Sequence, residues 1–163
     1  MIVTRISSWV PAMLLSAVFI LTGCAVTIPV DPDGTLDRIR REQVLRAGAS
    51  PRPGWVLVRS MTKDPTGREV DLVEGFASSL GAQVEWTVGG EEDLVARLED
   101  GSLDVVVGGL TDQNPFSADA AMTRPYLEEM AQGTVEAHVM FVPMGENALQ
   151  SALERWLDEA VPR

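Results

Sequence analysis

The chain has 163 residues, of which 24 are acidic and 13 basic, so its formal net charge is −11. This acidic balance argues against nucleic-acid binding, where Lys and Arg must neutralise phosphates, and against electrostatic adhesion to anionic lipid. A single cysteine rules out an internal disulfide.

The first 23 residues have the pattern of a secretory signal peptide. Arg5 is their only charge, an apolar run extends from residue 10 to residue 21, and small residues follow it. The run is shorter than the roughly 20 residues that cross a bilayer, so we expect export and cleavage before Cys24. Residues 24–34 are rich in Pro, Asp and Gly and are predicted to form a tether. One domain over residues 35–163 remains.

Beyond the tether, the hydrophobic pattern predicts alternating helices and strands. In chain order these are a helix at 35–40 capped by Thr35, strands at 44–49 and 55–58, a helix at 70–80, a strand at 83–88, a helix from Glu91 to Gly101, strands at 103–110 and 138–142, and a last helix capped by Asn147. The strand at 103–110 (LDVVVGGL) gives the strongest signal. Its valines do not alternate with polar residues, which predicts burial on both faces, as in a parallel sheet.

Strands that alternate with helices predict a doubly wound α/β domain. In such sheets ligands bind beyond the carboxyl ends of the strands. This rule selects three loops as the candidate site: Ser50–Trp55, Gly89-Gly90 and Gly109–Asp112.

The residue types that carry catalysis or bind metal are sparse. His138 is the only histidine, which leaves no metal site and no nucleophile–base arrangement to name. Asp112 and Asp119 are interpreted as solvated loop residues rather than as an acid/base pair. We therefore predict a protein that is not an enzyme and that has neither cofactor nor metal.

The residues Leu21-Thr22-Gly23-Cys24 resemble the bacterial lipobox at all four positions. This resemblance implies lipidation of Cys24, so that the mature protein is held on a membrane through lipid. The next residue is Ala25 rather than aspartate, which implies the outer membrane, facing the periplasm, if the host has two membranes. We expect a lipid-anchored protein of the cell envelope.

The order of segments resembles the bacterial extracellular solute-binding proteins of family 3, the polar-amino-acid type of ABC-transporter receptor. The resemblance rests on five segments in the family's order, namely 34–48 (GTLDRIRREQVLRAG), 67–72 (GREVDL), 94–111, 123–126 (TRPY) and 138–157. It implies the first lobe of a type II periplasmic-binding-protein fold. It also implies ligand contacts from Gly109 and Thr111, with Trp55 either a side wall of the site or part of the core.

Two departures from the family bear on function. Family members place a second lobe after the Pro-Tyr segment, but only eleven residues, 127–137, separate Tyr126 from His138. The chain therefore resembles the first lobe alone. Phe116 stands where the amino-acid-binding members have an arginine that binds the ligand carboxylate, and a phenyl ring cannot replace a guanidinium in that role.

Three functions remain open at this point. The first is a small-molecule-binding module with a site at Trp55, Gly109, Thr111 and Phe116, serving transport or sensing. The second is an interaction lipoprotein that binds an envelope protein, or a second copy of itself as a homodimer, in place of a solute. The third and most distant is a dehydratase-like enzyme.

Overall fold

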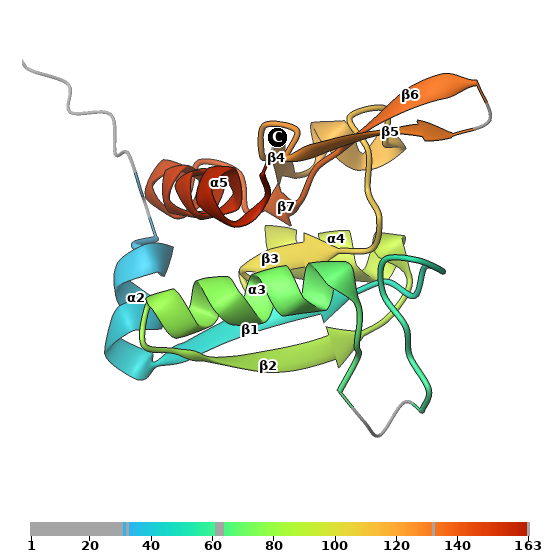
Figure 1. Ribbon diagram of the computed structural model, residues 1–163. Coiled ribbons are helices and arrows are strands. Elements are labelled where there is room, and N and C mark those ends of the chain that lie inside the picture. The colour runs from blue at the N-terminus through green and yellow to red at the C-terminus, as the bar shows by residue number, and fades with distance from the viewer. Residues whose placement is uncertain (1–30, 32, 61–63, 132, 163) are drawn as a thin grey trace, which may run out of the picture.

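The computed structural model describes residues 31, 33–60, 64–131 and 133–162 (Figure 1). The predicted signal peptide, Cys24 and most of the tether lie outside the described residues. No helix within the described ranges is long and apolar enough to cross a membrane.

A five-stranded sheet in the order β2-β1-β3-β7-β4 forms the centre of the domain. The strands β1 (Val44–Ala49), β2 (Gln83–Val88) and β3 (Val105–Val107) are parallel. The short strands β7 (Phe141–Val142) and β4 (Ala121–Met122) extend the sheet in antiparallel register. The carboxyl ends of β1, β2 and β3 therefore meet at one edge.

Helices cover both faces of this sheet. On one face, α2 (Thr35–Glu42), α3 (Arg68–Ser79) and α5 (Asn147–Ala160) pack over β1 and the side chains of Val105 and Val107. On the other face, α4 (Glu91–Glu99) packs over Val106 and Phe141. The valines of β3 thus face both cores, as their unalternating pattern predicts, and the doubly wound α/β class is confirmed.

Several predicted boundaries are wrong for local reasons. Residues 55–58 do not form a strand, because Gly54 at φ 87° turns the chain and leaves only isolated bridges to Arg52 and Thr66. Thr35 is not a cap but the first residue of α2, and its backbone N–H donates to the Glu146 carboxylate at 2.9 Å. Asn147 likewise begins α5 and does not cap it.

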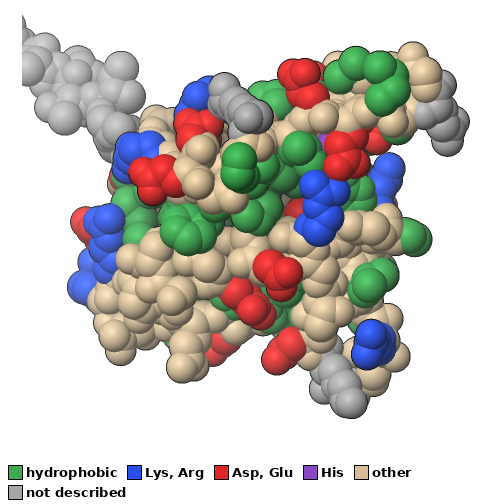
Figure 2. Space-filling view, in the orientation of Figure 1, with side chains coloured by type: hydrophobic (Ala, Val, Ile, Leu, Met, Phe, Trp, Pro, Cys, Tyr) green, Lys and Arg blue, Asp and Glu red, His purple; other side chains and the backbone are tan. Residues whose placement is uncertain are grey.

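The predicted strand at 138–142 is split in two, and the reason is a hairpin. The strands β5 (Leu127–Ala131) and β6 (Thr134–His138) pair with each other and form a separate two-stranded sheet. This hairpin projects from the carboxyl-end side of the sheet (Figure 1) and holds the eleven residues that stand in place of a second lobe. It carries exposed hydrophobic side chains (Figure 2), among them the cross-strand partners Met130, 72% exposed, and Val135, 55% exposed.

Candidate functional site

The three strand-end loops lie side by side, because they follow neighbouring parallel strands. The backbone N–H of Ser50 donates to the Val107 carbonyl at 2.8 Å, and the N–H of Gly89 donates to the Ala49 carbonyl at 3.2 Å. Gly108 packs so closely that a Cβ on it would lie 2.7 Å from the Ser50 Cβ. The rule about strand ends therefore places the predicted loops at one edge of the domain.

Trp55 forms the inner wall of this edge. It packs on Gly109, which has φ 62° and at which a Cβ would lie 2.7 Å from the indole Cδ1, so any larger residue there would be strained and would clash. The indole ring lies 3.8 Å from the His138 ring, centroid to centroid, and the Arg68 guanidinium lies 4.7 Å from the Trp55 ring. With 8% of its surface exposed, Trp55 belongs to the core and supports the loop from beneath.

A buried carboxylate fixes the position of Gly109. Glu69, in the first turn of α3, is fully buried and accepts the Gly109 N–H at 2.7 Å and the Tyr126 hydroxyl at 2.6 Å. Burial raises the pKa of Glu69, although both hydrogen bonds oppose the rise by favouring the ionised form. Burial and the neighbouring Glu69 carboxylate also raise the pKa of Tyr126. The Gly109 N–H is therefore already paired within the protein.

The return strand of the hairpin is joined to the loop that contains Thr111. Thr111 forms an antiparallel bridge with His138, and the N–H of Val139 donates to the Leu110 carbonyl at 3.0 Å. His138 is buried, and its Nδ1 has no hydrogen-bond partner in the part of the chain that the structure describes. Burial lowers the pKa of His138, while Glu129 and Glu136 on the hairpin oppose the decrease.

Phe116 is not brought into this group. It lies in a short 3-10 helix (Pro115–Ala118), where the Asn114 side chain accepts its backbone N–H at 3.0 Å. The ring is partly buried and packs against the hydrophobic cluster on the α4 side of the sheet. Three of the four predicted ligand residues, Trp55, Gly109 and Thr111, therefore lie together at the strand-end edge. Phe116 packs in the hydrophobic core instead.

Sequence reasoning missed four residues at this edge: Arg52, Glu69, Tyr126 and His138. A polar residue in the first turn of a helix or at a strand end gives no periodic signal, so only the three-dimensional contacts identify Glu69 and His138 as neighbours of the loop. Arg52 precedes Trp55 in a proline-flanked loop, and its closeness to Gly109 depends on the β1–β3 pairing.

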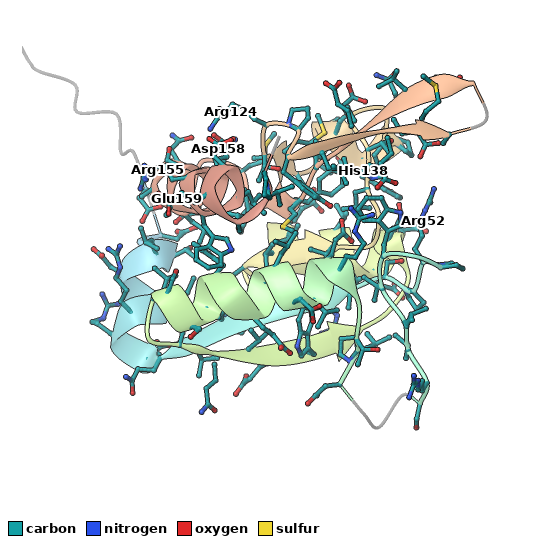
Figure 3. All side chains as sticks on the ribbon, viewed as in Figure 1. Arg52, Arg124, His138, Arg155, Asp158 and Glu159 are labelled. Carbon is teal, nitrogen blue, oxygen red and sulfur yellow. The ribbon has the colours of Figure 1, made fainter. Side chains whose placement is uncertain are left out.

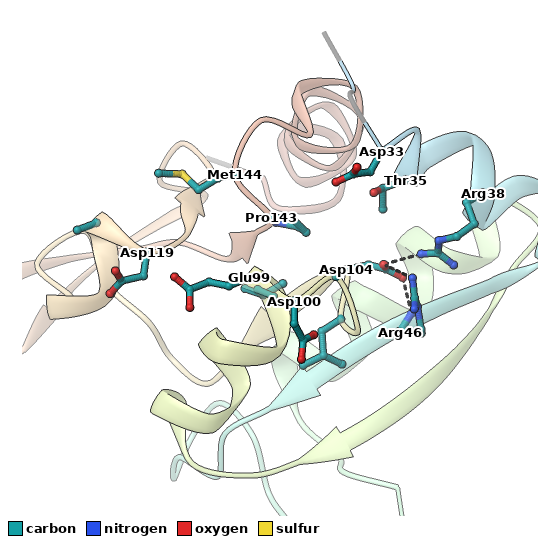
Figure 4. A pocket seen from close by; sticks show the side chains of 14 residues that line it. Asp33, Thr35, Arg38, Arg46, Glu99, Asp100, Asp104, Asp119, Pro143 and Met144 are labelled. Carbon is teal, nitrogen blue, oxygen red and sulfur yellow. Dashed lines mark hydrogen bonds and ion pairs between the residues drawn. The ribbon is translucent and has the colours of Figure 1, made fainter. Parts of the chain in front are cut away.

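The opposite end of the sheet holds a separate cavity of about 540 Å³ (Figure 4). At its base the buried Asp104 carboxylate accepts from Arg38 at 2.5 Å, from the Arg46 guanidinium at 3.3 Å and from the Arg46 backbone N–H at 2.8 Å. Asp119 lines this cavity, which places it away from the strand-end loops. No cluster of three or more potential metal-ligating side chains occurs among the described residues.

Comparison with known proteins gives one family and a set of similar structures. Residues 45–162, more than half of the chain, match the model of the bacterial extracellular solute-binding proteins, family 3. A comparison with curated sequences gives no match.

Among solved structures, the arginine-bound form of domain 1 of TmArgBP has a TM-score of 0.67 at 23% identity, covering 76% of this chain and 98% of that chain. A truncated, arginine-bound ArgBP from T. maritima has a TM-score of 0.66 at 14% identity, covering 76% of this chain and 99% of that chain. An ancestral amino-acid-binding protein, a precursor of cyclohexadienyl dehydratase, gives 0.65 at 15% identity, with 77% and 92% covered. At these identities the structures show the shared fold, which is that of a first lobe. The chain is a member of the bacterial extracellular solute-binding proteins, family 3, reduced to its first lobe.

Proposed function

We propose that this protein is a lipid-anchored solute-binding lobe of the cell envelope, which holds an amino acid at the strand-end loops for transport or sensing. The observation that carries this proposal is the convergence of the Ser50–Trp55 and Gly109–Asp112 loops around Thr111, on a lobe of the same fold as an arginine-bound domain 1. That neighbouring structure supports solute binding by a lobe without its partner lobe.

The affinity should be modest, because a lobe alone leaves one side of its ligand in water. A closed two-lobed site covers most of a ligand's surface, and a single lobe forfeits about half of that burial. A loss of about 4 kcal/mol weakens a micromolar receptor to roughly millimolar. We expect the hairpin β5–β6, which rises beside the loops, to recover part of this loss.

Titration of the purified chain with each of the standard L-amino acids, by calorimetry and ligand-observed NMR, tests the proposal. We expect at least one amino acid to bind with a dissociation constant of roughly 1 mM or below, and its resonances to broaden on addition of protein. If no amino acid showed binding at concentrations up to roughly 10 mM, the solute-binding function would be refuted.

A protein partner is the second candidate, and the hairpin is the observation that favours it. Met130 and Val135 form an exposed apolar pair at the place where relatives continue into another lobe. Adjacent exposed apolar side chains can form part of the larger apolar patches that mark protein-contact surfaces. If no amino acid bound in that titration, this candidate would be favoured, whether the partner is an envelope protein or a second copy of the chain. The third candidate, a dehydratase-like activity, has the ancestral neighbour as its only support.

The membrane anchor is proposed from the sequence around Cys24. We expect the protein extracted from membranes to begin at Cys24 and to carry acyl mass on that residue, because Leu21–Cys24 matches the lipobox. Intact-mass spectrometry measures both features, and Cys24→Ala serves as the unlipidated control. Recovery of a chain that still begins with Met1 would contradict the anchor.

A further inference from the structure

The proposed amino-acid site needs a cation for the ligand carboxylate, and position 116 does not supply one. Phe116 packs against the hydrophobic cluster on the α4 side of the sheet, whereas Trp55 belongs to the cluster on the other face. A carboxylate brought to the loop edge without a cationic partner would lose its strongest class of hydrogen bond. The following inference rests on the proposed function and asks which residue takes that role.

Two guanidinium groups lie at this edge, and they differ in their partners. Arg68 lies over Trp55 and is paired with Glu129 at 2.7 Å, whereas Arg52 lies against Gly109. The Arg52 Cδ is 3.0 Å from the position that a Cβ on Gly109 would occupy, so the side chain runs across the face of the loop. The side chain is exposed, and Arg52 takes part in none of the ion pairs found among the described residues.

The backbone beneath Arg52 is well supported. The Arg52 N–H donates to the Val56 carbonyl at 2.9 Å, and the Arg52 carbonyl accepts the N–H of Trp55 at 3.0 Å. Trp55 in turn packs between Gly109 and His138. The guanidinium is thus carried on a fixed turn, which reduces the entropy lost when it binds a ligand.

Charges of both signs act on His138, which packs on Trp55. In Figure 3 Arg52 and His138 lie at the same edge of the domain, below the hairpin. Glu136 on the hairpin lies 3.9 Å from the His138 Nε2, and Glu129 is paired with Arg68 at 2.7 Å. Arg52 also acts on His138, whose lowered pKa it helps to depress. A cation beside Gly109 and a carboxylate beside His138, the bridge partner of Thr111, therefore lie near the same loop.

We propose that Arg52 binds the α-carboxylate of the solute, in place of the arginine that position 116 lacks. Its guanidinium offers a bidentate pair of hydrogen bonds, and the hydroxyl of Thr111, on the neighbouring Gly109–Asp112 loop, offers a further donor. Glu136 then faces the ammonium group. The ligand class that this arrangement selects is a zwitterion with adjacent carboxylate and ammonium groups.

Two substitutions and two ligands test this assignment. The ligands are L-arginine, or the L-amino acid that binds best in the panel above, and its methyl ester, which lacks the carboxylate charge. The wild-type chain should bind the amino acid at least about tenfold more tightly than the ester, the ratio expected of a charge-assisted pair. Arg52→Gln should weaken the affinity for the amino acid by a similar factor and leave the affinity for the ester unchanged. Arg52→Lys should recover only part of the difference, since an ammonium is not bidentate.

The matched control is Arg155→Gln, which removes the same charge from an exposed position on α5, on the far side of the domain (Figure 3). It should bind both ligands as the wild type does. If Arg52→Gln, folded to the same thermal midpoint as the wild type, kept the preference for the free carboxylate, the assignment of Arg52 would be wrong while solute binding stood. If the wild type bound no amino acid, the proposed function and this inference would both be overturned.

Discussion

Replacing Glu69 by alanine should lower the free energy of unfolding by about 3 kcal/mol. The substitution removes the acceptor of two short hydrogen bonds and leaves the Gly109 N–H and the Tyr126 hydroxyl buried without a partner. Each hydrogen bond to a charged group contributes about 1.5–3 kcal/mol. The sum is reduced because burying the Glu69 carboxylate carries a desolvation penalty, which also raises its pKa. Urea denaturation followed by circular dichroism measures the change.

The variant Glu69→Gln separates the shape of this side chain from its charge. Its amide oxygen still accepts the Gly109 N–H, and the Tyr126 hydroxyl can turn to accept from the amide nitrogen, so about 1 kcal/mol should be lost. The pH dependence distinguishes the two chains. The folded-state pKa of Glu69 lies above its ordinary value of 4.5. At a pH between 4.5 and the raised pKa, the Glu69 carboxyl is therefore protonated to a greater extent in the folded state than in the unfolded state. Wild-type stability, measured against that of the Gln variant, should therefore fall as pH rises from about 4.5 through the raised pKa.

The opposite trend would contradict this account of Glu69. A wild type that gained stability over Glu69→Gln across that range would mean that the two hydrogen bonds outweigh burial and depress the pKa. An unchanged unfolding free energy in Glu69→Ala would mean that the loop and the hairpin are held in place without this carboxylate.

The sequence predicts the architecture well because the architecture depends on local hydrophobic patterns. The strands at 44–49 and 83–88 have the predicted bounds, and Val105–Val107 faces both cores because its residues are apolar without alternation. The predicted strand at 55–58 fails for a converse reason. Its apolar residues belong to a turn that packs against Gly67 and Gly109, contacts that no short-range pattern records.

The candidate site is less predictable, because its members come from five separate segments. Gly109 and Thr111 follow from the strand-end rule together with the family resemblance, but Glu69 reaches the same loop from forty residues earlier in the chain. The family resemblance predicts that Phe116 lines the ligand site, whereas its ring packs against the α4-side cluster.

The hairpin connects these observations. Its first strand follows Tyr126, which Glu69 holds, and its second strand ends at His138, which contacts Trp55 and bridges to Thr111. The hairpin is therefore anchored at both ends to the loops of the candidate site. A ligand that moved the Thr111 loop would move the base of the hairpin, and with it the exposed Met130–Val135 pair.

The second large effect is expected at the other end of the sheet. Asp104→Ala should lower the free energy of unfolding by about 3 kcal/mol, because removing one partner of a buried ion pair leaves the remaining charges uncompensated. Asp104 is buried and holds two guanidinium groups together with the Arg46 backbone N–H (Figure 4). The value is at the lower end of the range for buried pairs, since the side chains of Arg38 and Arg46 are 17% and 32% exposed and water can solvate them.

This substitution also serves as a test of where the ligand binds. The Asp104 network lies before the start of β3, whereas Gly109 and Thr111 follow its end, so the two regions are at opposite ends of the parallel strands. Asp104→Ala should therefore leave the affinity for the best-binding amino acid unchanged when both chains are measured well below their unfolding midpoints. Asp104→Asn, which keeps an oxygen for the Arg46 N–H, should lose about half as much stability as the alanine variant. A weakened amino-acid affinity in folded Asp104→Ala would place the ligand in the 540 Å³ cavity, because no other described contact links Asp104 to the strand-end loops.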